Sequence, residues 1–466
     1  MEKSKVIKNI SYSVFANLIS LLVSVFMVMI VPKFLSVKDY GTWQLFLFYF
    51  SYLGFFHFGW EDGIYLRYAG KNYKELDEKT FSGQFYSLLI FQIILACFIV
   101  IYANLFIEDL IKKEVIYCVS TILPFVNFNN LCSFIMQLTN RIKDYAVFIF
   151  IERVILLIGV CTCIFLGLNQ FENMYSAKVV SLICAFFLCA TTCKNLLKPT
   201  FYSFGTIFKE IKNNIFVGIK LMLANIASLL IIGIIRFGIS EGWDISTFGK
   251  VSLTLGISNF LMVFIDSVAV VLFPILKHID EENLSNLYKN LRSILIVVVL
   301  GILLFYYPIK ELLSWWLPKY SDGLNYMAVL FPICVFESKV SLLINTYLKS
   351  LRKEKLMLKI NFISVVISIV TTVFTVVVMH NLDFAILSIV GLYAFRSILA
   401  EYYLGKILNL KLTKEIILEL CIVSIFMGIS WNINNWNCMI LYGVTYLIFI
   451  GVNRKNIKDS LHLIWW

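Results

Sequence analysis

Ionisable side chains within or at the edges of long apolar segments are the residues of this sequence most able to do chemistry. These residues are His57, Glu61, Asp62, Glu152, Arg153, Lys178, Lys220, Arg236, Asp266, Glu337, Lys339, Arg396 and Glu401. An ionised group facing lipid at the bilayer centre costs at least ~2.5–3.5 kcal/mol, so such groups face the protein interior, pair, or reach the interface. The chemistry they predict is ion pairing, ion binding and recognition of a charged substrate.

The position of each ionisable residue along its apolar segment suggests how it is accommodated. Lys178, Lys220 and Glu401 lie near predicted helix ends, so we expect their side chains to extend to the membrane interface. Glu152 and Arg153 are adjacent, point in different directions on a helix and need separate partners. A third group lies nearest the centre of the membrane and cannot be explained by surface exposure. It consists of Glu337, Lys339 and Arg396.

Polar residues form stripes with helical spacing on three of the predicted helices. The stripes are Ser13, Asn17, Ser20 and Ser24; Asn225, Ser228 and Arg236; and Ser252, Asn259 and Asp266. For Ser and Asn two interpretations remain open, hydrogen bonding between helices or the lining of a polar cavity. We predict that Arg236 contacts substrate and that Asp266 is a conformational or coupling residue, while Arg396 either joins the cavity or pairs within the second half of the chain.

Signatures of catalysis and of resident cofactors are missing from the sequence. It has no Ser/His/Asp arrangement, no P-loop and no Gly-rich nucleotide fingerprint. Most of the eleven cysteines lie inside apolar segments, with no CxxC pair and no metal-ligand spacing. We therefore expect a protein that is not an enzyme and holds neither metal nor cofactor, with coupling to a proton or sodium gradient as an open possibility.

Composition and periodicity predict an all-α polytopic membrane protein of about fourteen transmembrane helices. Of 466 residues, 60% are hydrophobic and 15% are charged, where a soluble domain would carry about a quarter charged residues. Apolar runs of about twenty residues recur along the chain, each long enough to cross the hydrocarbon core. The predicted helices are 11–35, 42–60, 84–107, 115–139, 145–169, 174–194, 215–240, 248–276, 291–314, 325–348, 357–380, 383–405, 413–431 and 435–453.

Basic residues alternate between the loops and set the expected orientation. The two termini and the even-numbered loops hold 27 of the 40 Lys and Arg residues, Arg292 among them, and six lie in or beside the odd-numbered loops. The positive-inside rule then places both termini in the cytoplasm. The net charge of +11 belongs to this topology and does not indicate nucleic-acid binding.

An internal repeat relates the two halves of the chain at an offset of 208 residues. Ala16–Leu22 matches Ala224–Leu230, and Gly41 and Pro124 match Gly249 and Pro332. Both copies begin on the cytoplasmic side, so they are parallel, an architecture of transporters. We predict a six-helix lobe at 1–197, a cytoplasmic linker at 198–214, a second six-helix lobe at 215–409, and two further helices with a short tail at 410–466.

Two motifs carry a family resemblance that covers the whole chain. Tyr40-Gly41-Thr42-Trp43 follows the first helix, and the segment Gly59–Tyr68, with the sequence GWEDGIYLRY, lies at the cytoplasmic end of the second. The chain resembles bacterial polysaccharide repeat-unit flippases of O-antigen or capsule type, within the polysaccharide-transporter family of the MOP superfamily, which also holds the multidrug and toxin extruders. The resemblance implies a bacterial cytoplasmic membrane location and a V-shaped cavity between two lobes.

The resemblance also implies a substrate, an oligosaccharide on undecaprenyl diphosphate that is moved to the outer leaflet. A polysaccharide polymerase and chain-length machinery are the implied protein partners, beside membrane lipids. Cavities of this family are often cationic, whereas the intramembrane acids of this sequence nearly balance its bases. The cavity residues we expect are Asn17, Ser20, Glu61, Asp62, Arg67, Asn225, Ser228, Arg236, Asp266 and Arg396.

Alternatives remain at two levels. An ion-coupled multidrug or metabolite extruder would have the same fold, whereas a membrane polymerase is disfavoured because the predicted outer loops are short.

Two interpretations also remain open for the segment Gly59–Tyr68. Either Gly63 simply ends the second helix, or the segment is a gate in which Arg67 binds phosphate and Asp62 positions Arg67.

Overall fold

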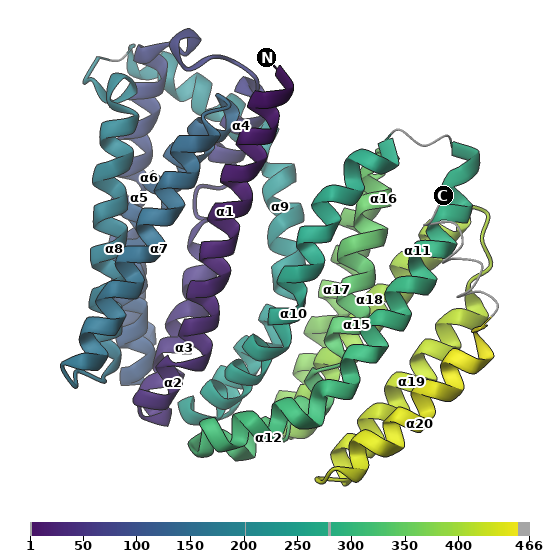
Figure 1. Ribbon diagram of the computed structural model, residues 1–466. Coiled ribbons are helices and arrows are strands. Elements are labelled where there is room, and N and C mark those ends of the chain that lie inside the picture. The colour runs from purple at the N-terminus through teal and green to yellow at the C-terminus, as the bar shows by residue number, and fades with distance from the viewer. Residues whose placement is uncertain (1, 201, 278–280, 455–466) are drawn as a thin grey trace. The chain divides into compact units, whose positions relative to one another are not determined.

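The computed structural model describes residues 2–200, 202–277 and 281–454, and their side chains except at 2–10, 13, 14, 261 and 263–283 (Figure 1). Every regular element in these ranges is helical, as the sequence predicts. The chain divides into two compact units, Met1–Ile226 and Ala227–Trp466. Each unit is described separately below.

The first unit consists of long antiparallel helices and one broken helix. Its helices are α1 (Glu2–Met29), α2 (Val31–Phe34), α3 (Val37–Leu53), α4 (Trp60–Tyr68), α5 (Glu78–Phe106), α6 (Leu110–Leu138), α7 (Ile142–Phe165), α8 (Phe171–Thr192) and the first part of α9 (Phe204–Gly242), with short 3₁₀ turns η1 (Tyr73–Glu75) and η2 (Lys194–Leu197). Helix α7 packs against α1 and α8, and α6 packs against α3, α5 and α8.

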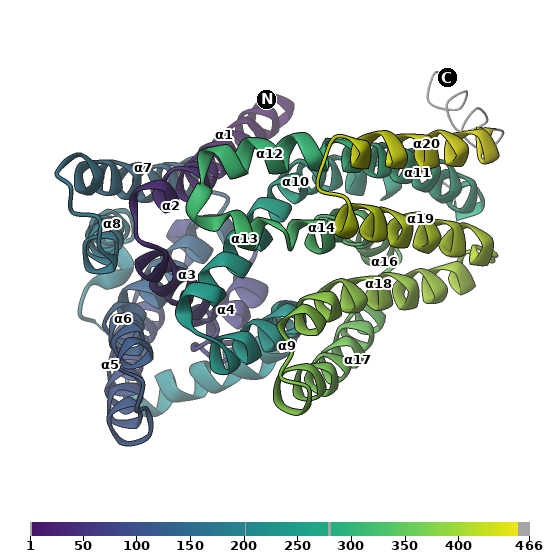
Figure 2. The ribbon, with the colours of Figure 1, turned by 90° about the horizontal axis from the view of Figure 1, so that it is seen from below.

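The second unit contains the rest of α9 and the remaining helices. These are α10 (Ile245–Lys277), α11 (Glu281–Ile302), η3 (Leu303–Phe305), α12 (Tyr306–Trp316), η4 (Pro318–Tyr320), α13 (Ser321–Leu324), α14 (Met327–Leu330), α15 (Ile333–Ser338), η5 (Lys339–Ile344), α16 (Asn345–Ser350), α17 (Glu354–Thr372), η6 (Val373–Val378), α18 (Leu382–Ile407), α19 (Thr413–Asn432) and α20 (Asn437–Val452). Figure 2 shows two pairs of antiparallel helices, in which α17 lies beside α18 and α19 lies beside α20. The segments η5 and η6 are π-helical.

Polar caps at the ends of the apolar runs determine where several helices begin. Ser36 accepts a hydrogen bond from the backbone N–H of Asp39, and Asp77 accepts one from Thr80. Asp109 and Asn381 cap α6 and α18 in the same way. Such caps satisfy backbone donors that have no partner in the first helical turn.

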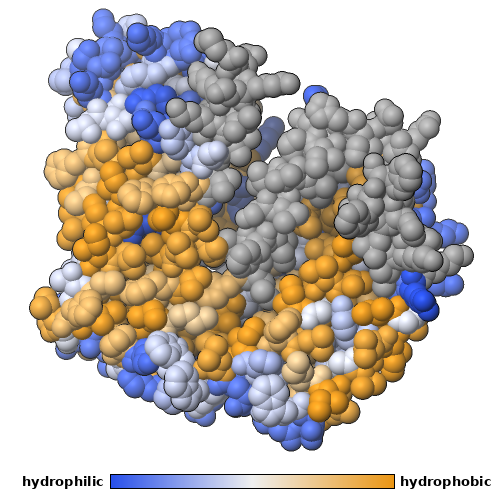
Figure 3. Space-filling model, in the orientation of Figure 1, coloured by the Kyte–Doolittle hydropathy of each residue, from blue (hydrophilic) through white to orange (hydrophobic). Residues whose placement is uncertain are grey.

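Length and composition confirm a multi-pass membrane protein. Eleven helices of the described chain are long and apolar enough to cross a membrane, and α20 is a shorter apolar helix. The predicted spans near 42–60 and 248–276 correspond to α3 and α10. On the face shown in Figure 3, apolar residues cover the middle of the first unit and hydrophilic residues gather toward its ends.

The region between the two halves differs from the predicted linker. Helix α9 begins at Phe204, so 204–214 is helical, because the amphipathic segment continues directly into the apolar run after it. The division between the compact units falls at 226, inside this 39-residue helix. Helical structure therefore begins within the predicted linker 198–214, and the role of this segment as a cytoplasmic linker stays a prediction.

The repeat detected in the sequence also appears in local structure. Helix α3 begins at Val37 and α10 at Ile245, which are related by the same 208-residue offset. Their caps, Ser36 and Asp244, match as well, since Asp244 accepts from the N–H of Ser246. The copies then diverge, because α3 ends at Leu53 whereas α10 continues to Lys277.

Candidate functional site

The break between α3 and α4 is the most unusual backbone feature of the first unit. Phe58 and Gly59 both have positive φ angles, 53° and 83°, and Gly59 precedes the first residue of α4. Glycine adopts this left-handed conformation without the steric penalty of a Cβ. The Gly59 N–H donates to His57 Nδ1 at 3.0 Å. The predicted second helix, 42–60, is therefore two helices joined by a hydrogen-bonded corner.

Three glycines bring α4 into backbone contact with α9. A Cβ on Gly63 would lie 1.9 Å from the Asn214 carbonyl oxygen, and a Cβ on Gly218 would lie 2.0 Å from the Gly59 carbonyl oxygen. A Cβ on Gly59 would lie 2.6 Å from the Ile219 nitrogen. Small residues commonly permit such close packing between membrane helices. Gly63 thus lies inside α4 as a packing residue, which rules out the interpretation, one of the two left open, in which it simply ends the second helix.

Polar side chains connect α4 to α5 and α9 beside these glycines. The Trp60 indole donates to Gln84 Oε1 at 3.0 Å, and the Asn214 amide donates to the same oxygen at 2.5 Å. Arg67 donates to Glu210 Oε2 at 2.8 Å and to the side-chain oxygen of Asn214. Arg67 therefore has a carboxylate partner on α9 in this conformation, and it is not held by Asp62.

Two carboxyl groups and an imidazole are buried at the start of α4. Glu61 is 0% exposed and Asp62 6% exposed. His57 Nε2 lies 3.9 Å from a Glu61 oxygen and 3.6 Å from an Asp62 oxygen. The predicted cavity residues Glu61 and Asp62 are thus enclosed within the first unit. They lie beside His57, for which the sequence alone gave only a weak indication of function.

A second polar cluster lies among α9, α10, α15 and α18 in the second unit. Arg396 donates to Glu337 at 2.9 Å and to the Ser228 hydroxyl at 3.3 Å. Arg236 donates to the Ser252 hydroxyl at 3.1 Å, and its guanidinium group lies over the Phe248 ring. Arg396 therefore pairs within the second half of the chain, one of the two possibilities raised by the sequence, and it meets the α9 stripe through Ser228.

The asparagines of the predicted stripes are exposed. Asn17, Asn225 and Asn259 are exposed, whereas Ser20 is half-buried. The side chain of Asp266 lies outside the described residues. An Asn amide on a membrane helix needs water or protein partners, so these positions favour polar surroundings over lipid.

A buried network of four charges joins α11, α18 and α19 at the start of η5. Lys339 Nζ lies 2.7 Å from Glu401 and 2.8 Å from Glu419, while Arg292 contacts Glu401 and lies 2.9 Å from Glu419. The Tyr288 hydroxyl donates to Glu401 at 3.1 Å. The network is electrically neutral, and each of its charged side chains is at most 6% exposed.

Several predictions about individual charges were wrong because helix packing brings partners together. Glu401 belongs to the buried network, and Lys178 pairs with Glu152 at 2.8 Å, so neither side chain extends to the interface. Arg292 was counted as a loop cation, yet it is buried within α11. Glu419 was not among the predicted residues, although an acid inside the apolar run 413–431 is itself a signal.

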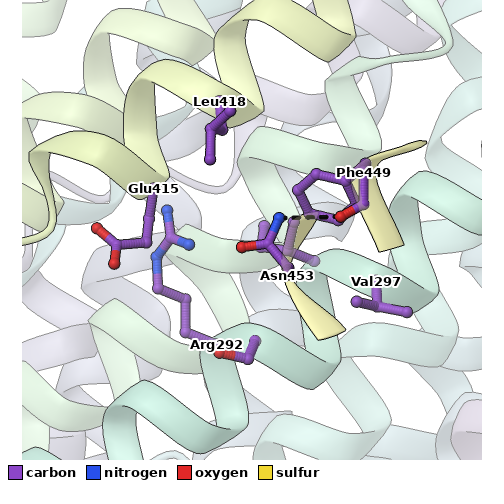
Figure 4. Close-up of a pocket in the computed structure, with 8 residues that line it drawn as sticks. Arg292, Val297, Glu415, Leu418, Phe449 and Asn453 are labelled. Atoms are coloured by element: carbon purple, nitrogen blue, oxygen red, sulfur yellow. Dashed lines mark hydrogen bonds between the residues drawn. The ribbon is translucent and has the colours of Figure 1, made fainter. Parts of the chain in front are cut away.

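A small crevice opens beside this network. It has a volume of about 370 Å³, including space open to the outside, and lies among α11, α19 and α20. Figure 4 shows Arg292 and Glu415 on one side of it and Asn453, which donates to the Phe449 carbonyl oxygen, on the other. The crevice is the place where the edge of the charge network approaches the surface of the unit.

Comparisons with known proteins identify the fold. No protein-family model and no curated protein matches the sequence. The structure is similar to that of the lipid II flippase MurJ in an inward closed conformation, with a TM-score of 0.67 and 15% identity over 97% of this chain and 100% of that one. It is also similar to an inward-facing multidrug resistance MATE family transporter of the MOP superfamily, with a TM-score of 0.62 and 12% identity over 88% of this chain and 99% of that one. The chain therefore has the fold of these membrane transporters.

Proposed function

We propose that this protein is a flippase that moves undecaprenyl-diphosphate-linked oligosaccharide repeat units across the bacterial cytoplasmic membrane by alternating access, for surface polysaccharide biosynthesis. The proposal is supported by the likeness to a lipid II flippase over almost the whole chain. It is also supported by the resemblance of the Gly59–Tyr68 segment to polysaccharide repeat-unit flippases. Both termini would lie in the cytoplasm, and the polymerase and chain-length machinery would act on the product.

The observation that carries the proposal is the pair of guanidinium groups at α9 in the second unit. Arg236 and Arg396 are held by the hydroxyls of Ser252 and Ser228, with Glu337 as the carboxylate bonded to Arg396. An arginine fork matches the geometry of phosphate oxygens, which could replace the serine hydroxyls as acceptors.

The spacing of these groups along α9 suggests successive contacts rather than a single phosphate site. Ser228, which bonds Arg396, and Arg236 are eight residues apart on α9, an axial rise of about 12 Å at ~1.5 Å per residue. Asn225 lies on the same helix and is exposed. We expect a diphosphate headgroup to pass from one guanidinium group to the other along this face.

The test is deletion of the gene followed by analysis of surface glycan and of lipid-linked intermediates. We expect loss of surface glycan and accumulation of the lipid-linked oligosaccharide, restored by the wild-type protein. Arg236→Gln should restore transport at least tenfold less well than wild type, and Arg236→Lys should be intermediate, because a lysine keeps the charge but not the fork. Normal glycan in the deletion strain would overturn the proposal.

The alternative is an ion-coupled multidrug or metabolite extruder, favoured by the likeness to a MATE family transporter. The same deletion strain separates the two functions. Unchanged glycan together with increased sensitivity to cationic drugs would establish the extruder. Accumulated lipid-linked oligosaccharide with unchanged drug tolerance would establish the flippase.

A further inference from the structure

The Glu61 carboxyl group is the most isolated titratable group in the described part of the chain. The residue is 0% exposed, and both of its carboxyl oxygens are buried without a hydrogen-bond partner among the residues described. An ionised carboxylate without compensation in an apolar environment costs several kcal/mol, and such a group takes up a proton instead. Its surroundings therefore determine its charge.

The elements packed around α4 provide no cation at hydrogen-bonding distance from Glu61. On its own segment the titratable neighbours are His57 and Asp62. Helix α6 contributes apolar residues and the buried thiol of Cys132, and α5 contributes the uncharged Gln84. Helix α9 contributes Glu210, which is paired with Arg67 of α4 itself, so this guanidinium group is already bonded to a carboxylate. The local charge balance is negative unless protons are bound.

The His57 ring directs its Nε2 nitrogen toward these carboxyl groups. Its Nδ1 accepts a hydrogen bond from the Gly59 N–H, so a neutral ring carries its proton on Nε2. That nitrogen is the atom 3.6 Å from Asp62 and 3.9 Å from Glu61. Asp62 has 8% of its side chain exposed, whereas Glu61 has none. Asp62 is thus the more accessible of the two carboxyl groups.

The site depends on the corner in the backbone. Glu61 lies in the first turn of α4, two residues after the left-handed Gly59, and α4 is fixed to α9 by glycine contacts. The repeat places Ala269 and Val270 of the uninterrupted α10 at the positions of Glu61 and Asp62. Since the second copy has neither the break nor the acids, the architecture of the repeat does not require them.

We propose that Glu61 is a proton-binding site, protonated in this conformation, and that release of its proton requires the first turn of α4 to become accessible to water. A deprotonated Glu61 is stable only when water reaches it, so proton release needs a conformation in which the first turn of α4 is hydrated. The inference concerns the protein alone and holds whether the transported molecule is a lipid-linked saccharide or a drug.

The experiment is infrared spectroscopy of the purified full-length protein in detergent. At neutral pH we expect an absorption from a protonated carboxyl group that disappears in Glu61→Gln, a loss equivalent to one group. The matched control is Glu75→Gln, which removes an exposed carboxylate of the same unit and should leave the absorption unchanged. An absorption that persists in Glu61→Gln, or is absent from the wild type, would overturn the proposal.

Stability provides a second readout that requires no substrate. Glutamine has nearly the shape of a protonated glutamic acid, so Glu61→Gln should melt at or above the wild-type temperature at neutral pH. Amide hydrogen exchange of peptides within 54–70 should lose the pH dependence seen in wild type, beyond the intrinsic chemical effect. Failure of both Glu61→Gln and Glu61→Leu to fold would show that an ionised carboxylate is required, and would also overturn the proposal.

Discussion

Replacing Lys339 tests the buried charge network of the second unit. In Lys339→Met, Arg292 remains as the only cation of the network against Glu401 and Glu419, so one negative charge stays buried without compensation. Removing one partner of a buried ion pair typically costs about 3–5 kcal/mol. We therefore expect strong destabilisation although the volume of the side chain is nearly retained.

The predicted effect is large enough to measure as a melting temperature. An unfolding entropy of about 2.1 cal/mol/K per residue gives roughly 0.5 kcal/mol/K for a unit the size of Ala227–Trp466. A loss of about 3–5 kcal/mol then lowers the melting temperature by roughly 6–10 °C. The assay is thermal unfolding of the purified protein in detergent, followed by tryptophan fluorescence.

A double variant separates charge imbalance from loss of packing. Lys339→Met/Glu419→Gln leaves Arg292 paired with Glu401, which it contacts through two nitrogens, and restores neutrality. We expect it to recover about 2–3 kcal/mol relative to Lys339→Met alone. The exposed Lys353→Met is the matched control, with an expected change below about 0.5 kcal/mol. A Lys339→Met protein as stable as this control, or a double variant no better than the single one, would refute the reasoning.

Three further predictions concern the first unit. Gly63→Ala should reduce stability by about 1–3 kcal/mol or more, because its Cβ would collide with the backbone of α9. The control Gly205→Ala, whose Cβ would meet open space, should be tolerated, and equal melting temperatures of the two variants would contradict the backbone contact. Arg67→Ala should lower transport without lowering membrane abundance, since its half-exposed ion pair contributes at most about 1 kcal/mol; parallel loss of both would favour a purely structural residue. Reporter fusions after Lys71 and Leu168 should report the cytoplasm and the outside respectively, and the reverse result would invert the predicted topology.

The helices could be predicted from the sequence because a helix that spans the membrane needs about twenty consecutive, mostly apolar residues. Each of the fourteen predicted segments overlaps a helix or a run of helices, and errors are confined to ends and breaks. The corner at Phe58–Gly59 was missed because the sequence around it is as apolar as a continuous helix. A left-handed residue leaves no hydropathy signal, and a glycine in an apolar run is consistent with either conformation.

Partners of the buried charges could not be predicted, although the charges themselves could. Glu401 and Lys178 lie near helix ends, and hydropathy alone does not distinguish an interfacial side chain from one that faces a neighbouring helix. Arg292 lies beside loop residues in the sequence but on the packed face of α11. Pairings such as Arg292 with Glu419 join residues 127 positions apart, so they depend on tertiary packing that periodicity does not contain.

The glycine contact between α4 and α9 changes how variation in the segment Gly59–Tyr68 should be interpreted. Substitution at Gly59, Gly63 or Gly218 destabilises the protein through backbone collision, whatever the protein transports. Retention of these glycines among homologues would therefore report only the shape of the fold. Packing alone does not require an acid at position 61, because a leucine or glutamine could fill the volume of Glu61. An acid conserved at this position among diverging homologues would therefore indicate selection for a group that binds a proton.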